Sequence, residues 1–296
     1  MKLLITGASG FIGQALVQRL AEAGHQLTLL SHRRPLPPGH TPLRSLDGLS
    51  RSEVFDGVVN LAGAPIFDRR WSESRKQQLW DSRVDLTHRL VTVLAQLETP
   101  PAFLLSGSAI GVYGDQGETR LTEETPLRPA GFGQRLCAAW EAAAEGVDRL
   151  GTRRVTLRTG LVVGRNGGFL QPMRHSFSLG LGGTVGRGTQ YMSWIHLEDT
   201  LRLLLFLIDQ PDARGVINLT APNPVTNAEF TDQLAAKLGR PARLPMPAAA
   251  LRLIMGERAE LLLESQRVVP ERALKGGFQF QYETLDSALA EVLAAA

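Results

Sequence analysis

Cysteine is nearly absent from this chain of 296 residues, in which Cys137 is the only one. A single thiol excludes an internal disulfide and is typical of proteins in a reducing compartment, so we expect a cytoplasmic location. No apolar run reaches the length of about 18 residues that a membrane-spanning helix needs. The apolar run that begins at Leu3 predicts a strand at the start of the chain, and no signal peptide.

Blocks of like charge are missing too. The 32 Lys and Arg residues nearly balance the 29 Asp and Glu residues, and the net charge is +3. We therefore predict no nucleic-acid partner and no membrane partner. Because His, Cys, Asp and Glu do not cluster at metal-ligand spacing, no metal is expected. The length suffices for one large domain or slightly more, with a small molecule as the expected partner.

The most informative segment is the beginning of the chain. The apolar run Leu3 to Ile5 ends in the glycines Gly7, Gly10 and Gly13, and an apolar-periodic stretch follows. This order predicts a strand, a tight turn at Gly7, a close approach to a phosphate at Gly10, and a helix packed on a sheet at Gly13. Ser9 is a candidate helix cap or phosphate ligand. Bare N–H groups and the positive end of a helix dipole suit a pyrophosphate at this turn.

Strands and helices alternate along the chain. The helix that begins at Phe11 is predicted to end near Gly24, and a strand over 26–30 completes the first unit. Further strands are predicted over 57–63, 103–108 and 154–161, and helices within 71–97 and 138–150. This alternation predicts an α/β fold, a Rossmann-type doubly wound parallel sheet with ligands at the carboxyl ends of its strands.

The residues after the second strand indicate the cofactor. A site for NAD usually has Asp or Glu there, to bind the ribose 2′-hydroxyl. This chain has Ser31, His32 and Arg33, followed by Arg34. A guanidinium can bind a 2′-phosphate through two hydrogen bonds, so the sequence predicts NADP(H), with Arg33 as the main phosphate ligand and Ser31 beside it. The alternative is that these arginines belong to a solvated loop.

The sequence resembles the extended short-chain dehydrogenase/reductases, a group that includes nucleotide-sugar epimerases and dehydratases. The matching motifs are Thr6–Gly13, Asn60–Gly63, Ser106–Ala109 with Val112–Gly114, and Ile195–Asp199. More narrowly, residues 192–196, 219–224 and 267–270 are similar to an epimerase-like subfamily with a distinctive C-terminal domain of unknown function. The resemblance covers almost the whole chain. It implies a Rossmann fold, an NADP-type cofactor and a possible homodimer.

One motif of the resembling family is missing. Its active members have a Tyr-x-x-x-Lys pair about two dozen residues after the Ser motif, and the resemblance implies that this Tyr moves a proton while the nicotinamide moves a hydride. Here Phe132 or Gly133 takes the Tyr position, and Leu136 or Cys137 takes the Lys position. The cofactor motifs are therefore intact, whereas the usual proton-transfer pair is not.

The catalytic candidates are Ser108 and Tyr113. Ser108 matches the family's active-site Ser, which implies a hydrogen bond to the substrate oxygen; a Ser that caps a loop is the alternative. Tyr113 is the nearest phenol, although the family pattern implies that it packs beside the cleft. Arg83 is expected to contact cofactor phosphate or an anionic substrate, or to be a surface Arg. Cys137 lines the nicotinamide pocket or is an inert buried thiol. The expected cofactor contacts are Gly7, Ser9, Gly10, Phe11, Ile12, Gly13, Ser31, His32, Arg33, Leu61, Ala62, Gly63, Arg83, Ser106, Cys137, Gly160 and Leu161.

The second half of the chain is expected to supply the substrate side. Residues 164–188 are rich in glycine, which predicts a mobile loop over a cleft. Gln190, Met192 and Trp194 are candidate substrate contacts, and His196 is predicted to be structural. Helical periodicity over 227–239, 247–264 and 285–293 predicts helices, with core positions at Leu253, Ile254, Leu261, Leu262 and Leu263.

These observations predict two unequal parts. A dinucleotide-binding domain is expected over 1–165, with contributions from about 190–220. A partly interleaved substrate-side lobe is expected over 166–296, mainly helical from about residue 240, with the substrate between the two. Two functions fit: an NADP(H)-dependent oxidoreductase or epimerase-like enzyme, or a non-catalytic NADP(H) redox sensor. The Ser motif and the substrate lobe favour the enzyme, and the missing Tyr and Lys favour the sensor.

Overall fold

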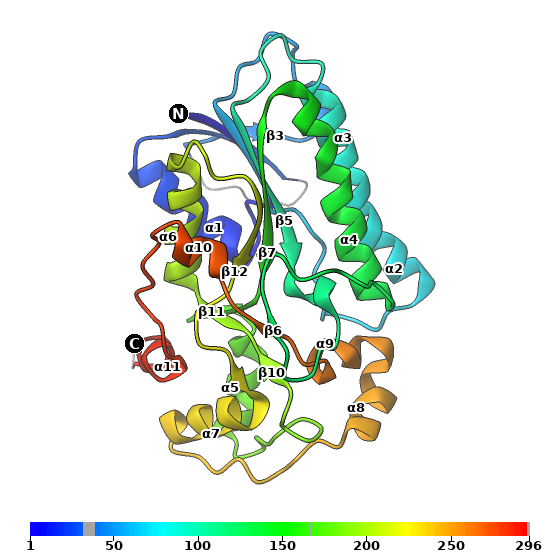
Figure 1. Cartoon of the computed structure of the whole chain (residues 1–296), viewed down its shortest axis with the longest axis vertical. Helices are drawn as coiled ribbons and strands as arrows, with labels where there is room; N and C mark the ends of the chain where they lie inside the picture. Colours follow the sequence, from blue (N-terminus) through cyan, green and yellow to red (C-terminus); the bar gives the residue numbers. More distant parts are fainter. Residues whose placement is uncertain (32–38, 166, 295–296) are drawn as a thin grey trace.

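A parallel sheet of seven strands forms the centre of the molecule, in the order β12-β7-β5-β4-β1-β2-β3 (Figure 1). The computed structural model describes residues 1–31, 39–165 and 167–294. The strands are β1 (Lys2–Thr6), β2 (Gln26–Leu30), β3 (Thr41–Leu43), β4 (Gly57–Asn60), β5 (Phe103–Ala109), β7 (Arg153–Thr159) and β12 (Gly215–Leu219). The strand order reverses between β1 and β4, where ligands bind in sheets of this kind.

Helices cover both faces of the sheet. Helices α1 (Phe11–Glu22) and α6 (Leu197–Asp209) lie on one face, and α2 (Glu73–Trp80), α3 (Leu86–Leu94) and α4 (Phe132–Ala144) lie on the other (Figure 1). Leu3 and Ile5 of β1 point into the core under α1 and α6, whereas Leu4 points into the core under α3. Because both faces are buried, the strands are continuous apolar runs rather than alternating ones.

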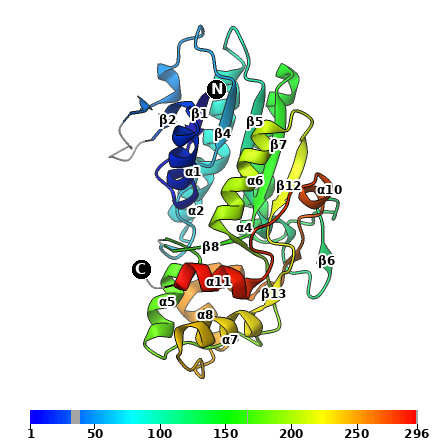
Figure 2. The ribbon, with the colours of Figure 1, turned by 90° about the vertical axis from the view of Figure 1, so that its left-hand side faces the viewer.

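A second lobe lies beyond the carboxyl ends of the strands (Figure 2). Its core contains Trp194, Phe230 and Leu289. The remaining elements of the described chain are β6 (Arg120–Leu121), β8 (Leu161–Gly164), β9 (Gly167–Gly168), α5 (Leu170–Ser178), β10 (Tyr191–Met192), β11 (Trp194–His196), β13 (Val225–Thr226), α7 (Asn227–Leu238), α8 (Ala248–Met255), α9 (Glu260–Leu263), β14 (Arg267–Val268), α10 (Glu271–Lys275) and α11 (Leu285–Leu293).

The last part of the chain is divided between the two lobes. Strand β14 pairs with β6, and α10 packs against β12 at the edge of the large sheet. Phe278 and Phe280 are buried in the core under α1 and α6, where Phe278 contacts Phe206 edge-on. The chain then returns to the second lobe as α11 (Figure 2). Because apolar side chains of this segment need burial that the large sheet provides, the C-terminal residues do not form one helical unit.

Two expectations about the second lobe are wrong. The glycine-rich stretch 164–188 contains helix α5, whose Leu170 and Phe177 are buried and which packs against α7. Leu253 and Ile254 are 78% and 59% exposed, whereas Leu251 of the same helix is buried. Helical spacing predicted the helix, but it did not predict which side of α8 faces the protein.

Candidate functional site

The turn after β1 has the geometry that a dinucleotide requires. Gly7 has φ +73°, and an added Cβ would lie 2.5 Å from the carbonyl carbon of Leu61. A Cβ at Gly13 would lie 2.1 Å from the Gly7 carbonyl oxygen. At Gly10 the nearest atom to an added Cβ is 3.2 Å away, and this residue is exposed. Gly7 and Gly13 therefore let the protein pack against itself, whereas Gly10 is exposed and its contact with the backbone is less close.

The N-terminus of α1 carries no side-chain cap among the described residues. Gly10 occupies the cap position, so Ser9 does not cap the helix, and the first turn contains no acidic residue. The backbone N–H groups of Phe11 and Ile12 therefore remain available to an anion at the positive end of the helix dipole. The phenyl ring of Phe11 lies against the second lobe, where Cβ atoms at Gly167 and Gly168 would lie within 2.7 Å of the ring.

A buried polar network holds the end of β4 beside this turn. Thr6 Oγ1 donates to Asn60 Oδ1 at 2.6 Å and accepts from the Ala62 backbone N–H at 3.1 Å. Asn60 Nδ2 donates to Thr87 Oγ1 at 2.8 Å and to Ser106 Oγ at 3.3 Å. This network brings Leu61, Ala62 and Gly63 to the carboxyl edge of the sheet and buries Ser106 below it.

The residues expected at the 2′-phosphate lie at the end of β2. Ser31 is half-buried, and its backbone N–H donates to the Leu43 carbonyl at 3.1 Å. His32 and Arg33 lie outside the described residues, so the proposed phosphate ligand is a prediction from sequence.

Ser108 faces a buried ion pair. Its Oγ donates to Glu141 Oε1 at 2.7 Å, and Arg158 binds both oxygens of Glu141 at 2.8 and 2.9 Å. Ser108 and Arg158 are 4% exposed. Burial opposes the charge of Arg158, but its bonds to Glu141 more than offset this and raise its pKa. The hydroxyl hydrogen of Ser108 is therefore engaged by the protein itself.

Tyr113 belongs to the same network. Its hydroxyl contacts Arg158 Nη1, Asn218 Oδ1 and the Thr122 carbonyl at 2.9, 2.9 and 3.0 Å. Burial raises the pKa of this phenol, although Arg158 opposes the shift. Tyr113 is 2% exposed. This hydroxyl therefore bonds to groups of β7, β12 and the segment after β6.

The positions of the missing Tyr and Lys in α4 have apolar surroundings or a neutral side chain. An added Cβ at Gly133 would lie 3.6 Å from Trp71 and 3.8 Å from Leu261, which are apolar neighbours. Cys137 is buried, and burial raises the pKa of its thiol to about 11. The thiol is therefore neutral at physiological pH.

A model of the NAD dependent epimerase/dehydratase family matches residues 3–220. The chain belongs to this family. A domain of unknown function, DUF1731, matches residues 246–292. These matches confirm the resemblance predicted from the glycine and C-terminal motifs.

Relatives match this epimerase-family chain over nearly its whole length. The mouse epimerase family protein SDR39U1 is 38% identical, over 99% of this chain and 100% of the relative. A relative from Mycobacterium tuberculosis, epimerase family protein MT2273, is 41% identical over 96% of this chain and 95% of its own. The crystal structure of human SDR39U1 (isoform 2) with NADPH is 36% identical, covers 100% of both chains and has a TM-score of 0.91. The Rossmann-type fold is thereby confirmed.

The residues expected on the substrate side of this family member are buried. Trp194 is 0% exposed, and its Nε1 donates to the Asn223 carbonyl at 3.1 Å. Gln190 Nε2 donates to the carbonyls of Val185 and Leu262 at 2.9 and 3.0 Å. Met192 packs in the core of the second lobe. These three side chains pack within the second lobe and are at most 7% exposed.

The strand junction at Gly160 joins the two lobes. A Cβ at Gly160 would lie 2.4 Å from the Ser193 carbonyl oxygen, and the Leu161 N–H donates to that oxygen at 2.9 Å. His196 Nδ1 accepts from the Glu198 N–H at the start of α6, and its Nε2 lies 3.0 Å from Glu291. Burial lowers the pKa of His196. These contacts agree with the structural role expected for His196.

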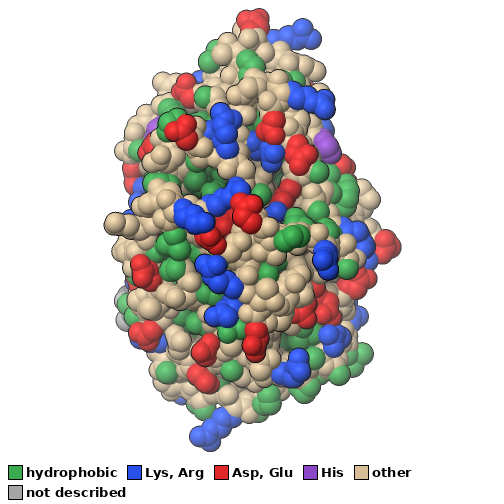
Figure 3. All heavy atoms as spheres, in the orientation of Figure 1, with side chains coloured by type: hydrophobic (Ala, Val, Ile, Leu, Met, Phe, Trp, Pro, Cys, Tyr) green, Lys and Arg blue, Asp and Glu red, His purple; other side chains and the backbone are tan. Residues whose placement is uncertain are grey.

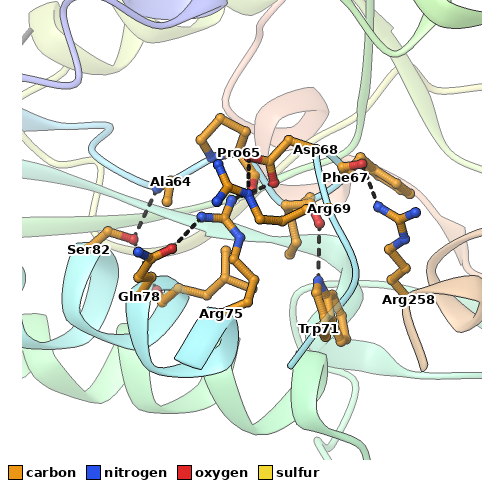
Figure 4. Close-up of polar contacts among 12 residues, drawn as sticks. Ala64, Pro65, Phe67, Asp68, Arg69, Trp71, Arg75, Gln78, Ser82 and Arg258 are labelled. Atoms are coloured by element: carbon orange, nitrogen blue, oxygen red, sulfur yellow. Dashed lines mark hydrogen bonds and ion pairs between the residues drawn. The ribbon is translucent and has the colours of Figure 1, made fainter. Parts of the chain in front are cut away.

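The loop after Gly63 forms a bridge between the lobes (Figure 4). Arg75 is 5% exposed and binds the Pro65 carbonyl and Asp68, and Trp71 Nε1 donates to the Ile66 carbonyl at 3.1 Å. Arg258 of the second lobe donates to the Phe67 carbonyl at 2.9 Å. Arg70 in turn donates to carbonyls at the end of α8. Residues 64–71 are therefore fixed by side chains from both lobes.

Charges of both signs are mixed on the surface around α10. Acidic and basic side chains are interspersed over α10 on the face shown in Figure 3, where Arg272 pairs with Glu124 and Lys275 with Glu271. Within residues 1–31, 39–165 and 167–294, no helix is long and apolar enough to cross a membrane. The same residues contain no group of three or more His, Cys, Asp and Glu placed to hold a metal ion.

Sequence reasoning missed Glu141 as a site residue. The available signal was Arg158, a charged residue in the interior of the strand predicted over 154–161. A buried charge requires a partner, so an acidic residue had to face it from a neighbouring element. The sequence alone could not show that this residue also takes the hydrogen of Ser108.

Proposed function

We propose that this protein binds NADP(H) at the carboxyl edge of its sheet and acts by hydride transfer on a carbonyl or alcohol carbon of a small molecule. The observation that carries the proposal is the uncapped N-terminus of α1 above Gly7, Gly10 and Gly13. It is supported by the human relative, which matches over its full length and was crystallised with NADPH.

The described residues fit a dinucleotide phosphate. The space at Gly10 would be filled by any Cβ, and the α1 N-terminus offers N–H donors without a competing carboxylate. Leu61 to Gly63 would lie along the cofactor. Arg33 would hold the 2′-phosphate. When bound, NADPH supplies a hydride.

In this proposal the side chains near Ser108 hold strand ends in place and supply no acid. Glu141 and Arg158 hold the end of β5 through Ser108, and Tyr113 joins this group to β12 through Asn218. The positions of the usual Tyr and Lys carry no ionisable group with a pKa near neutrality. The proton that balances hydride transfer would then come from water, from the ribose hydroxyl or from a side chain outside these two positions.

A second function is favoured by one observation. The segment that carries the Tyr and Lys of active relatives here presents Gly133 to apolar neighbours and a neutral Cys137. A protein that binds NADP(H) without consuming it would act as a redox sensor, with the fixed loop 64–71 as the element that both lobes control.

A fluorescence titration of NADPH and NADH tests the cofactor proposal. We expect NADPH to bind more tightly, Arg33→Ala to remove the preference, and Arg34→Ala to keep most of it. Equal affinity for both nucleotides, or no binding, would contradict the proposal. Single-turnover assays of bound NADPH with a panel of carbonyl compounds then separate the two functions: consumption with any compound supports the enzyme, and tight binding without consumption supports the sensor.

A further inference from the structure

Arg83 carries a charge that no carboxylate balances. Its Nη2 donates to the Ala64 carbonyl at 3.0 Å, and its Nη1 lies 3.4 and 3.5 Å from the Leu79 carbonyl and Ser82 Oγ. All of these acceptors are neutral. In the described part of the chain, no Asp or Glu oxygen lies within the 4.0 Å of an ion pair with this guanidinium.

The neighbours of Arg83 add no negative charge. Burial lowers the pKa of Arg83, and nearby Arg75 lowers it further. Arg75 is itself paired with Asp68, and Glu141 is paired with Arg158. Cys137 is a neutral thiol. The local charge is therefore positive, which is costly unless an anion arrives.

The guanidinium is held by its neighbours beside an exposed glycine. It lies over the ring of Trp140, 5.3 Å from the ring centroid, and Trp140 Nε1 is fixed by a 3.1 Å bond to Thr87. On its other side is Gly63, where an added Cβ would lie 3.0 Å from the guanidinium carbon. Gly63 is exposed. Arg83 also lies in the π-helical turn Asp81–Asp85, a feature that is frequent at functional sites.

The position of Gly63 just after β4 indicates which anion Arg83 would bind. The 2′-phosphate side of the fold is at the end of β2, and the pyrophosphate site is at α1, beside β1. In the strand order, β4 lies on the opposite side of β1 from β2. The end of β4 therefore faces the nicotinamide half of a dinucleotide, which has no anionic group beyond the pyrophosphate.

We propose that Arg83 binds a carboxylate of the substrate, so that the protein acts on small carbonyl or hydroxy compounds that are carboxylic acids. One guanidinium matches one carboxylate in charge and in its two parallel donors. This inference rests on the proposed NADP(H)-dependent function, because the substrate carboxylate would lie beside a bound nicotinamide.

The test measures binding of oxamate, acetate and succinate to the protein with and without saturating NADPH, by thermal shift and by NADPH fluorescence. We expect at least one of the three to bind the NADPH complex, and Arg83→Gln to weaken that binding by about tenfold or more, because the variant loses hydrogen bonds from a charged donor. Arg83→Lys should lose less. Arg69→Gln, at a residue whose side chain is 66% exposed in the same region, is the matched control and should bind as the wild type does.

Three results would overturn the inference. The first is that none of the carboxylates binds the NADPH complex. The second is binding that Arg83→Gln leaves unchanged. The third is an Arg83→Gln variant that loses NADPH affinity while carboxylates compete with NADPH, which would assign Arg83 to the cofactor phosphate. Inorganic phosphate is a further probe. If phosphate binding depends on Arg83 and carboxylate binding does not, the site is a phosphate site, and this result also contradicts the proposed carboxylate ligand. Failure of NADPH itself to bind the wild type is seen separately and contradicts the proposed function.

Discussion

Ser108 Oγ donates its hydrogen to Oε1 of Glu141 across 2.7 Å, and so joins the end of β5 to α4. Arg158 occupies both oxygens of the same carboxylate. The pair is nearly enclosed, with side chains 5% and 12% exposed for Arg158 and Glu141. This ion pair holds the end of β5 and α4 in place, because neither charge can move without leaving the other buried and uncompensated.

Glu141→Gln should therefore destabilise the fold strongly. Removal of one partner from a buried pair typically costs about 3–5 kcal/mol, because the remaining charge stays buried. Urea unfolding checks this. Asp47→Asn, which removes an exposed pair with Arg89, is the control and should change stability far less, because water screens exposed pairs. Similar, small losses in both variants would show that Arg158 does not depend on Glu141.

Two glycines of the same motif should respond differently to alanine. Gly13→Ala places a Cβ 2.1 Å from the Gly7 carbonyl oxygen, and we expect a loss of about 1–3 kcal/mol in unfolding free energy. Gly10→Ala has its nearest atom at 3.2 Å, so stability should change by less than about 1 kcal/mol, while NADPH affinity falls about tenfold or more. Gly111→Ala, where an added Cβ meets nothing within 4 Å, controls for the substitution itself. Unchanged NADPH affinity in Gly10→Ala would place the phosphate elsewhere.

Stability should depend on pH through Glu264. Burial raises the pKa of Glu264 to about 7, with Glu260 and Asp115 adding to the shift although Gln134 donates to the carboxylate at 2.8 Å. The folded state then holds a proton that the unfolded state releases at lower pH, so stability falls as the pH rises from about 5 to 8. Because Glu264 is partly exposed, we expect Glu264→Gln to gain on the order of 1–2 kcal/mol relative to the wild type over this range.

Thermal unfolding of both proteins at pH 5 and pH 8 measures this gain. Glu98→Gln, at an exposed carboxylate, should follow the wild type. A Glu264→Gln variant that shows the same pH dependence as the wild type would assign the dependence to another group.

Arg258→Ala should release the bridge between the lobes. It removes the donor to the Phe67 carbonyl (Figure 4) while Arg70 and Arg75 keep their own contacts. Because Phe67 is 39% exposed, we expect faster cleavage by chymotrypsin after Phe67 with a loss of stability below about 1.5 kcal/mol. Mass spectrometry of the digest identifies the site. Arg187→Ala, at an exposed residue of the second lobe, should be cleaved at the wild-type rate; equal rates in both variants would mean that Arg258 does not hold the loop.

Local elements were predicted well because their causes are local. The strand over Gln26–Leu30 and the helix over Leu285–Leu293 have the predicted bounds, since an apolar run between turn residues and helical spacing each need only neighbouring residues. The helix α5 was missed because glycines on both sides of it dominate the composition of 164–188. Leu253 and Ile254 were expected in the core because spacing does not show which face of a helix meets the protein.

Only part of the candidate site was predicted, because only some of its features depend on neighbouring residues. The roles of Gly7 and Gly13 follow from a turn of a few residues, and the structure gives both the close contacts that demand glycine. The surroundings of Ser108, Tyr113 and Trp194 depend on residues far away in the chain, and their burial could not be inferred from the motifs that contain them.

The sequence by itself determined the strand–turn–helix unit with its three glycines, the family, and the absence of the Tyr and Lys pair, because each of these is written in adjacent residues. Only the tertiary structure decided that Ser108 gives its hydrogen to Glu141, 33 positions away, and that Arg83 has no acidic partner among the residues that the structure describes. Hydrogen bonding and charge compensation depend on which groups the packed helices and strands bring within a few ångströms of one another, and spacing along the chain does not encode that distance.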